Sequence, residues 1–258
     1  MHKKTKTFAI LACLIVGGSA LYAAVNVSLS KLQLKFKDRI AAGNILAFML
    51  QGIIKTETIN NRKRENVLVL GIPRGGVLTA DIVARKLSVG FDIVIARKLG
   101  DPENKEEAIG AVAEDGTVYI DQKLVNSLQI SQEYIEKEKS QQMKQIKDKA
   151  HIYHTVIRES KIEGKIIILV DDGAATGSTI IAAARWIKKR EPKRLIVAVP
   201  VAPRQTVESL KKEADHIQVI TSPSSSSFRS IGQFYQNFYP ITDEQVISII
   251  RNRNLSPH

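Results

Sequence analysis

The sequence predicts an α/β fold in which helices flank a parallel sheet. Short apolar runs of the buried-strand type recur along the chain and alternate with segments of helical periodicity. The chain has 258 residues, and 44% of them are hydrophobic, so it can bury the core that this fold class needs. One cysteine excludes a disulfide framework and a Cys-rich zinc site.

The first elements expected after residue 30 are a helix, a strand, a second helix and a second strand. The helix over 31–51 has its apolar residues on one stripe, and a polar loop is expected to follow over 55–66. Continuous apolar runs predict buried strands at 66–71 and 91–96. The helical pattern between these strands covers 75–87.

The middle of the chain is expected to hold a mobile loop, a hairpin and a long helix. Residues 98–108 are charged and contain a glycine and a proline, which is typical of a loop. Residues 109–120 have the pattern of a hairpin with Glu114-Asp115-Gly116 at its turn. The helix over 131–157 carries many charges, which we expect to form a solvated face.

The last third continues the alternation of strands and helices. Strands are predicted at 165–170, 195–199 and 217–220, helices at 178–190 and 206–214, and a Ser-rich loop at 222–227. In parallel sheets, ligands bind outside the carboxyl ends of the strands. The loops after Leu70 and Val170 follow two such ends, so they are where we expect the site.

Residues 1–30 are expected to form a segment separate from the domain over 31–258. The stretch 7–30 carries no charge and is long enough to cross a bilayer as a transmembrane helix. Both flanks are basic, so the positive-inside rule gives no orientation. Three interpretations stay open: a membrane tether through 7–27, a cleaved signal peptide with the small-residue site Gly18-Ser19-Ala20, and an extension upstream of the true start codon.

The charge balance indicates an anionic partner. Lys and Arg number 38 against 26 Asp and Glu, which gives a net charge of +12. Such a balance suits nucleic acid, acidic lipid or a phosphate-rich small molecule. Aromatic residues are only 5% of the chain, which argues against a stacking platform for single-stranded nucleic acid.

The loop after Val170 has the residues for a sugar phosphate. Two carboxylates, Asp171 and Asp172, can accept hydrogen bonds from a vicinal diol. The small residues and hydroxyls of 173–179 open a helix and favour a phosphate at its N-terminus. A P-loop is excluded because no lysine follows Gly177 and the glycine spacing differs. The plain structural alternative is a capped strand-to-helix turn.

This segment resembles the motif with which type I phosphoribosyltransferases bind phosphoribosyl pyrophosphate (PRPP). The resemblance implies their α/β fold, with a parallel sheet, a mobile loop and a C-terminal hood. It also implies that Asp171 and Asp172 hold the ribose hydroxyls. The residues that would wrap the 5-phosphate are Gly173, Ala174, Ala175, Thr176, Gly177, Ser178 and Thr179.

Two further loops fit the same family. The resemblance implies that Pro73, Arg74, Gly75 and Gly76 bind pyrophosphate, and glycines with a guanidinium fork suit phosphate oxygens. Arg97 and Lys98 end the second predicted strand and are expected to contact phosphate and stabilise the transition state. The stretch 97–116 is similar to the mobile catalytic loop of these enzymes, whose closure excludes water.

The general acid/base and the acceptor site are also expected from the family. Ala175 stands where 6-oxopurine transferases carry an Asp, whereas adenine-type enzymes use a Glu in the mobile loop, so Glu114 is the candidate, ahead of Glu106 and Glu107. The aromatic segment with Phe228, Phe234 and Tyr235 is expected to be a hood over a planar acceptor. Its alternative role is a C-terminal cap packed on the core.

The expected function is transfer of ribose 5-phosphate from PRPP to a nitrogen heterocycle with release of pyrophosphate. Mg²⁺ would be carried by PRPP near Asp171 and Asp172 and would neutralise the leaving group. The resemblance implies a cytoplasmic catalytic domain, a homodimer and a nucleotide-salvage role, without nucleic acid as partner. Two alternatives stay open: a non-catalytic regulator that senses PRPP or nucleotides, and a membrane-tethered scaffold with a degenerate site.

Overall fold

The computed structural model describes residues 35–59, 66–105, 107–156 and 160–254. The chain divides into two units, Met1–Leu34 and Lys35–His258, and all described residues belong to the second. The segment expected to be a membrane tether, 7–27, lies outside the described residues. Among the residues that are described, no helix is long and apolar enough to cross a membrane.

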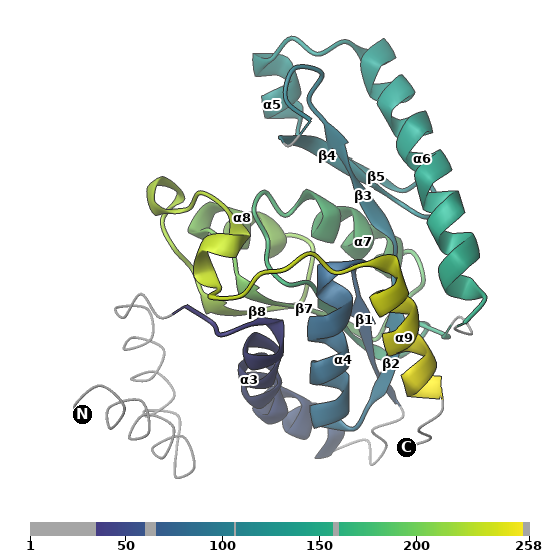
Figure 1. Ribbon diagram of the computed structural model, residues 1–258, viewed down its shortest axis with the longest axis vertical. Helices are drawn as coiled ribbons and strands as arrows, with labels where there is room; N and C mark the ends of the chain where they lie inside the picture. Colours follow the sequence, from purple (N-terminus) through teal and green to yellow (C-terminus); the bar gives the residue numbers. More distant parts are fainter. Residues whose placement is uncertain (1–34, 60–65, 106, 157–159, 255–258) are drawn as a thin grey trace. The chain divides into compact units, whose positions relative to one another are not determined.

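A five-stranded parallel sheet forms the centre of the second unit, which confirms the predicted α/β class (Figure 1). Its strands lie in the order β2-β1-β6-β7-β8. Their bounds are Gly90–Ile93 for β2, Val67–Gly71 for β1, Ile166–Val170 for β6, Arg194–Val201 for β7 and His216–Thr221 for β8. The strands β1 and β6 are neighbours in the sheet, so the two loops expected to bind the ligand follow adjacent strand ends.

Both faces of this sheet are buried, which explains why its strands are continuous apolar runs. In β1, Leu68 and Leu70 belong to one hydrophobic core while Val67 and Val69 belong to another. The first core contains α7 (Ser178–Lys188), and the second contains α3 (Arg39–Ile59) and α4 (Gly75–Leu87). Because successive side chains of a strand point to opposite faces of the sheet, one strand contributes to both cores.

A second sheet of three antiparallel strands lies beside the first. It contains β3 (Ala96–Gly100), β4 (Ala108–Ala113) and β5 (Val118–Ile120) in that order. The apolar run predicted as one strand at 91–96 is thus divided: β2 ends at Ile93, and β3 begins at Ala96 in the other sheet. The predicted hairpin is confirmed as β4 and β5, with Glu114-Asp115-Gly116 between them.

The second sheet packs between α7 and the long helix α6 (Gln132–His154), which stands upright at the right of Figure 1. The sequence predicts this helix, and Ser131 caps it by accepting a hydrogen bond from the Tyr134 N–H. The expectation that the charges of this helix form a solvated face is wrong for Glu138. This residue is buried, together with Gln142, on the side of the helix that faces β3. Glu138 accepts a hydrogen bond from Lys105 at 3.0 Å, so its charge is paired.

Helix boundaries differ from the prediction where capping and tertiary contacts decide them. The helix expected over 31–51 is α3, which begins only at Arg39, because the Asp38 carboxylate caps it by accepting from the Ala41 N–H at 2.8 Å. It also continues beyond the predicted end, to Ile59. The described residues form three further α-helices, α5 (Gln122–Ser127), α8 (Arg204–Leu210) and α9 (Asp243–Asn254), and two short 3₁₀ helices, η2 (Ser225–Ser227) and η3 (Ile231–Phe234). Of these, the sequence predicts only α8.

The start of this unit pairs with the aromatic segment that precedes α9. Phe36 forms a bridge with Tyr235, with backbone hydrogen bonds from the Phe36 N–H to the Phe234 carbonyl and from the Gln236 N–H to the Phe36 carbonyl, both at 2.7 Å. The Phe36 and Tyr235 rings are in contact, with centroids 5.2 Å apart. The C-terminal aromatic segment is therefore fixed to the start of the domain.

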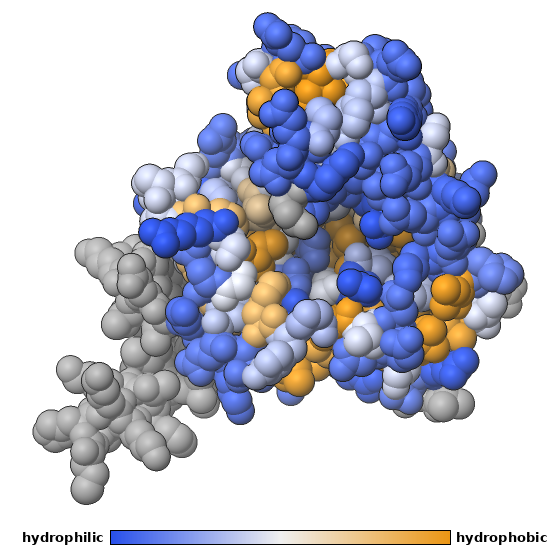
Figure 2. Space-filling model, turned by 45° about the horizontal axis from the view of Figure 1, so that its top comes forward, coloured by the Kyte–Doolittle hydropathy of each residue, from blue (hydrophilic) through white to orange (hydrophobic). Residues whose placement is uncertain are grey.

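The surface is mostly hydrophilic on the face shown in Figure 2, and its apolar residues gather in small separate patches. Large exposed apolar side chains do occur on α3, at Ile40, Ile45 and Phe48.

Candidate functional site

The loop between β6 and α7 has the shape of a phosphate cradle. Gly177 has φ of +81°, a left-handed conformation that glycine adopts without strain, and it leads directly into α7. The hydroxyls of Thr176 and Ser178 lie 2.9 Å apart at the N-terminus of this helix. Thr206 holds the loop from α8 by donating to the Ala175 carbonyl at 2.5 Å. Hydroxyls, small residues and a helix N-terminus thus meet at one place, as an anion site requires.

The two acids before this loop face the loop that follows β1. A Cβ atom on Gly75 would lie 2.0 Å from Oδ2 of Asp172, and one on Gly76 would lie 2.6 Å from Oδ1 of Asp171. Real side chains do not approach so closely, so only glycines fit here. The structure therefore brings together the predicted ribose-binding acids and the predicted pyrophosphate loop.

The carboxylates of Asp171 and Asp172 have different surroundings. Asp172 is buried, and its Oδ2 accepts a hydrogen bond from Nε of Arg39 at 2.7 Å. Burial raises the pKa of the Asp171 carboxyl well above its usual range, and the adjacent charge of Asp172 raises it further. Arg39 acts against this rise. Asp172 is thus the acid of the pair whose carboxylate accepts a hydrogen bond from Arg39.

Arg74 lies in the loop after β1 and is half-exposed, with 52% of its side chain accessible. Its Nη1 is 3.9 Å from Oδ1 of Asp243, at the start of α9. The peptide bond between Pro73 and Arg74 is cis. The Ile72 N–H donates to the Val170 carbonyl at 3.1 Å, which joins this loop to the end of β6.

Arg97 and Lys98 point to opposite sides of β3, as consecutive strand residues must. Nε of Arg97 donates to Oε1 of Gln142 on α6 at 2.7 Å. Burial lowers the pKa of Arg97. The positive charge of Arg74 lowers it further by electrostatic repulsion. Lys98 is exposed. The structure thus brings Arg97 towards Arg74 and turns Lys98 to the other side of β3.

A polar cluster at the start of α9 supports the two arginines. Asp243 accepts hydrogen bonds from Tyr153, at 2.6 Å, and from Lys149, both on α6. Burial raises the pKa of the Tyr153 hydroxyl, and its bond to Asp243 raises it further. Burial alone would raise the pKa of Asp243, but Lys149, Tyr153 and Arg74 together hold it below its usual range. Asp243 is therefore an ionised group placed beside Arg74.

Glu114 lies away from the loop that opens α7. It lines a hollow of about 250 Å³ with His154, and its Oε2 is 3.5 Å from Nε2 of that histidine. The next residue, Asp115, pairs with Arg190, just beyond the last turn of α7, at 3.5 Å. The phosphate cradle is at the first turn of this 11-residue helix, which spans about 16 Å. The structure does not bring Glu114 to the cradle. Glu107 is exposed, and Glu106 lies outside the described residues.

The three predicted hood aromatics have two different roles. Phe228 and Phe234 stack on each other with ring centroids 5.8 Å apart. Tyr235 is only 3% exposed, and its hydroxyl donates to the carbonyl oxygen of Asp172 at 2.6 Å. The segment does lie over the cradle, because a Cβ on Gly173 would meet Ile231 at 2.6 Å. Tyr235 is thus a buried support of the loop, whereas Phe228 and Phe234 form its outer aromatic pair.

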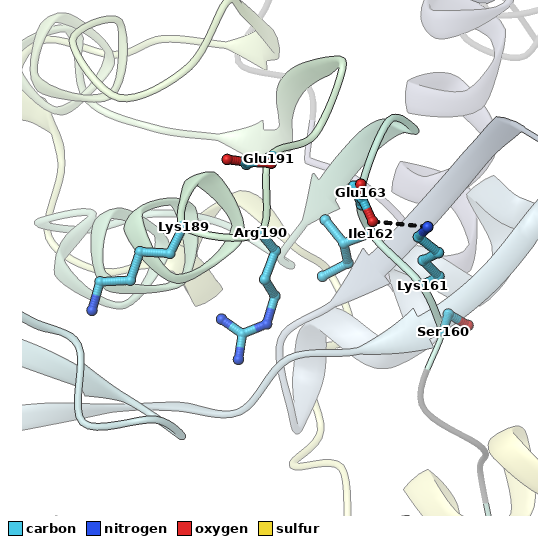
Figure 3. Close-up of a pocket in the computed structure, with 7 residues that line it drawn as sticks. All are labelled: Ser160, Lys161, Ile162, Glu163, Lys189, Arg190 and Glu191. Carbon is cyan, nitrogen blue, oxygen red and sulfur yellow. Dashed lines mark ion pairs between the residues drawn. The ribbon is translucent and has the colours of Figure 1, made fainter.

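The hollow drawn in Figure 3 is not at this place. It measures about 480 Å³ and is lined by residues before β6 and after α7, among them Lys161, Glu163 and Arg190. These residues belong to the amino edge of the parallel sheet, opposite the cradle. Lys161 and Glu163 pair at 2.8 Å on an open surface, so their charges largely cancel.

The residues present fit a metal ion that arrives with its substrate. Within the described part of the chain, no group of three or more His, Cys, Asp or Glu side chains could hold a metal ion on its own. Asp171 and Asp172 place carboxylate oxygens beside the cradle, and such oxygens suit Mg²⁺ when substrate phosphates complete its coordination.

Sequence reasoning misses Arg39 and Asp243. Arg39 is 133 residues from its partner Asp172, and no local pattern distinguishes it from other basic residues near the N-terminus. Asp243 begins a helix that the sequence does not predict, although an acidic pair, Asp243-Glu244, in a first helical turn is a recognisable signal.

Comparisons with known proteins agree with this geometry. A family model described as phosphoribosyl transferase domain matches residues 38–235. Two Mycobacterium tuberculosis proteins, MT0597 and Rv0571c, are provisionally named phosphoribosyl transferases, and each is 30% identical to this chain over 215 residues. The matched region covers 83% of this chain and 46% of each relative, so the chain spans about half their length.

A solved structure is also similar over most of the chain. The crystal structure of TT1426 from Thermus thermophilus is 36% identical, with a TM-score of 0.66. The match covers 85% of this chain and 99% of that one. A similar arrangement over most of the chain therefore recurs in a solved protein.

Proposed function

Because the chain belongs to the phosphoribosyl transferase domain family, we propose that it transfers ribose 5-phosphate from PRPP to a ring nitrogen of a heterocycle. The observation that carries the proposal is the meeting of two loops: Asp171 and Asp172 lie against Gly75 and Gly76, beside the cradle that opens α7. The type I phosphoribosyltransferase fold expected from the resemblance fits the observed parallel sheet and flanking helices.

The cradle over 173–179 is proposed to bind the 5-phosphate. Its hydroxyls and the N-terminus of α7 supply donors and a favourable dipole for a dianion. Asp171 and Asp172 would then accept hydrogen bonds from the ribose hydroxyls. This arrangement orients C1 of the ribose towards the attacking nitrogen, which is the positioning part of catalysis.

The loop after β1 is proposed to hold the pyrophosphate group. Burial lowers the pKa of Arg97 and the positive charge of Arg74 lowers it further, and a bound polyanion would relieve this repulsion. As the bond from C1 to pyrophosphate breaks and the nitrogen–C1 bond forms, these cations would stabilise the charge on the leaving oxygen. Mg²⁺ supplies further neutralisation of the pyrophosphate when it is bound.

The acid/base assignment of Glu114 stays a prediction from sequence and is not part of this proposal, because the residue lies at the far end of α7. The homodimer, the membrane tether, the cytoplasmic location and the salvage role also stay predictions. Phe228 and Phe234 are still proposed to contact the planar acceptor, since their rings form the outer pair of the segment over the cradle.

The test is Mg²⁺-dependent release of pyrophosphate from PRPP by the full chain, with a panel of purines, pyrimidines and other nitrogen heterocycles. We expect pyrophosphate release with one class of acceptor. In the Asp171→Asn/Asp172→Asn variant, the rate of release should fall by at least about a hundredfold. Glu163→Gln, an exposed acid at the amino edge of the sheet, is the matched control and should keep full activity.

The outcomes separate three cases. Release that persists in the double variant would contradict the assigned ribose site. PRPP binding without release for any acceptor would favour the regulatory alternative. A chain that does not bind PRPP at all would overturn the proposed function.

A further inference from the structure

Arg39, the first residue of α3, joins three parts of the molecule although only 8% of its side chain is exposed. Its Nε donates to Oδ2 of Asp172 at 2.7 Å, and its Nη1 donates to the Tyr239 carbonyl at 2.7 Å. Its guanidinium lies over the ring of Phe238, 3.9 Å from the centroid. One side chain thus contacts the acidic pair and the C-terminal aromatic segment together.

The position of the Asp172 carboxylate depends on these contacts. Its Oδ2 lies against both Gly75 and Arg39, and the Tyr235 hydroxyl holds the backbone of the same residue. A carboxylate this deeply buried is costly unless it is paired. Without Arg39, the carboxylate would lose the partner that fixes its position and would turn towards solvent. This change would remove an acceptor from the ribose site.

We propose that Arg39 is a positioning residue for the ribose of PRPP, which acts by fixing the Asp172 carboxylate and by tying it to the aromatic segment over 235–239. The inference rests on the proposed function and adds a residue to it. Arg39 acts through Asp172 rather than by touching substrate, because its side chain is nearly enclosed.

The inference distinguishes the ribose contacts from the phosphate contacts. The cradle over 173–179 has its own supports, such as the bond from Thr206 to the Ala175 carbonyl, which do not involve Arg39. Loss of Arg39 should therefore weaken recognition of the ribose hydroxyls and leave phosphate recognition in place. A purely structural role would weaken both alike or neither.

The experiment compares binding of ribose 5-phosphate and 2-deoxyribose 5-phosphate, each measured by displacement of PRPP from the full chain with Mg²⁺. The wild-type chain is expected to prefer the ribose form by roughly tenfold, the effect of a hydrogen bond to a charged acceptor. Arg39→Met should reduce this ratio to about one and weaken PRPP binding roughly tenfold or more. Arg39→Lys keeps the positive charge but not the planar guanidinium group. Its ratio of ribose to deoxyribose binding should therefore lie between those of the wild type and Arg39→Met.

The matched control is Arg85→Met, on the last turn of α4. Arg85 also bonds a carboxylate through Nε, at 2.9 Å to Asp81, but it lies at the opposite end of its helix from Gly75. This variant should keep the wild-type ratio. An unchanged ratio in Arg39→Met, or in Arg39→Lys if the methionine variant does not fold, overturns the inference.

Failure of the proposed function would look different. A wild-type chain that binds neither PRPP nor ribose 5-phosphate would overturn both proposals. A wild-type chain that binds PRPP, together with Arg39 variants that discriminate the two sugars equally well, would overturn this inference alone.

Discussion

At the scale of single residues, the site depends on two glycines, which have no side chain, as much as on its charged side chains. Gly75 and Gly76 leave the space that the carboxylates of Asp172 and Asp171 occupy. In the loop after β1, glycine is required by close approach rather than by an unusual backbone angle. The Gly-Gly pair can be identified in the sequence, but the atoms that fill its space come from a distant part of the chain, after β6.

Gly76→Ala tests this close approach. The new methyl group would lie 2.6 Å from Oδ1 of Asp171 and 2.8 Å from the Cα of Asp171, and that backbone is held by the sheet. We expect a loss of about 1–3 kcal/mol in the free energy of unfolding and loss of PRPP binding. Urea unfolding and calorimetric titration with PRPP measure the two effects.

The control for this change is Gly52→Ala in α3, where a Cβ would meet no atom within 4 Å. An alanine in a helix is favoured over glycine by roughly 0.5–1 kcal/mol, so this variant should be as stable as wild type or more so, with normal PRPP binding. Equal behaviour of the two alanine variants would contradict the close approach.

Sequence reasoning succeeds for residues that act locally and fails for those that act across the fold. The acids, the glycines and the hydroxyls of the two loops are consecutive in the chain, so their chemistry is visible there. Arg39 reaches Asp172 over 133 residues, and Tyr235 supports the same residue from the other direction. Only the packing of α3 and the aromatic segment against the sheet creates these contacts.

At the scale of elements, the junction of α6 and α9 positions the loop with Arg74. Asp243 is the first residue of α9, where a carboxylate also stabilises the helix dipole, and it is bonded to Lys149 and Tyr153 on α6. The short helix α9 thus connects the long helix to the pyrophosphate side of the site.

Asp243→Asn should reduce the free energy of unfolding by about 1–2 kcal/mol at pH 7. Because the folded protein holds the pKa of Asp243 below its usual range, this stabilisation is fully present above the pKa of the unfolded chain, about 3.9. It is lost as the pH falls through the lower, folded value. Urea unfolding at pH 7, 5 and 3 should show the difference from wild type shrinking at the lowest pH.

Asp148→Asn provides the comparison, since Asp148 is an exposed acid on the same helix α6. Its effect on the unfolding free energy should stay below about 0.5 kcal/mol throughout. A pH-independent loss in the Asp243 variant would mean that its charge does not stabilise the junction.

Elements are predictable where pattern and burial agree. The strands β1 and β6 and the helix α4 are strongly patterned, and their bounds match the prediction closely. The run at 91–96 predicts one strand because its residues are nearly all apolar, yet the chain changes sheets after Ile93. Composition cannot show such a change, because the residues on both sides of it, Ile93 and Ala96, are apolar and buried alike.

At the scale of the whole domain, the N-terminal and C-terminal segments close on each other through Phe36 and Tyr235. Phe36 is 7% exposed and belongs to the hydrophobic core that contains α3 and α4. Since the Tyr235 hydroxyl also bonds to Asp172, closure of the domain and support of the site share one residue.

Phe36→Ala should destabilise the domain by about 3 kcal/mol, as expected for a truncated core aromatic. Phe48→Ala is the matched control, because Phe48 lies in α3 but is 46% exposed, and it should cost less than about 1 kcal/mol. Thermal and urea unfolding of both variants measure the difference. Equal losses would show that closure contributes nothing specific.

The contact between Arg39 and the aromatic segment also determines when the site becomes complete during synthesis. Arg39 is made 200 residues before its partner Tyr239. At roughly 5–20 residues per second, this interval lasts on the order of 10–40 s. During that time α3 lacks the segment that completes its core. The nascent chain consequently acquires its finished site only after Tyr239 has been made.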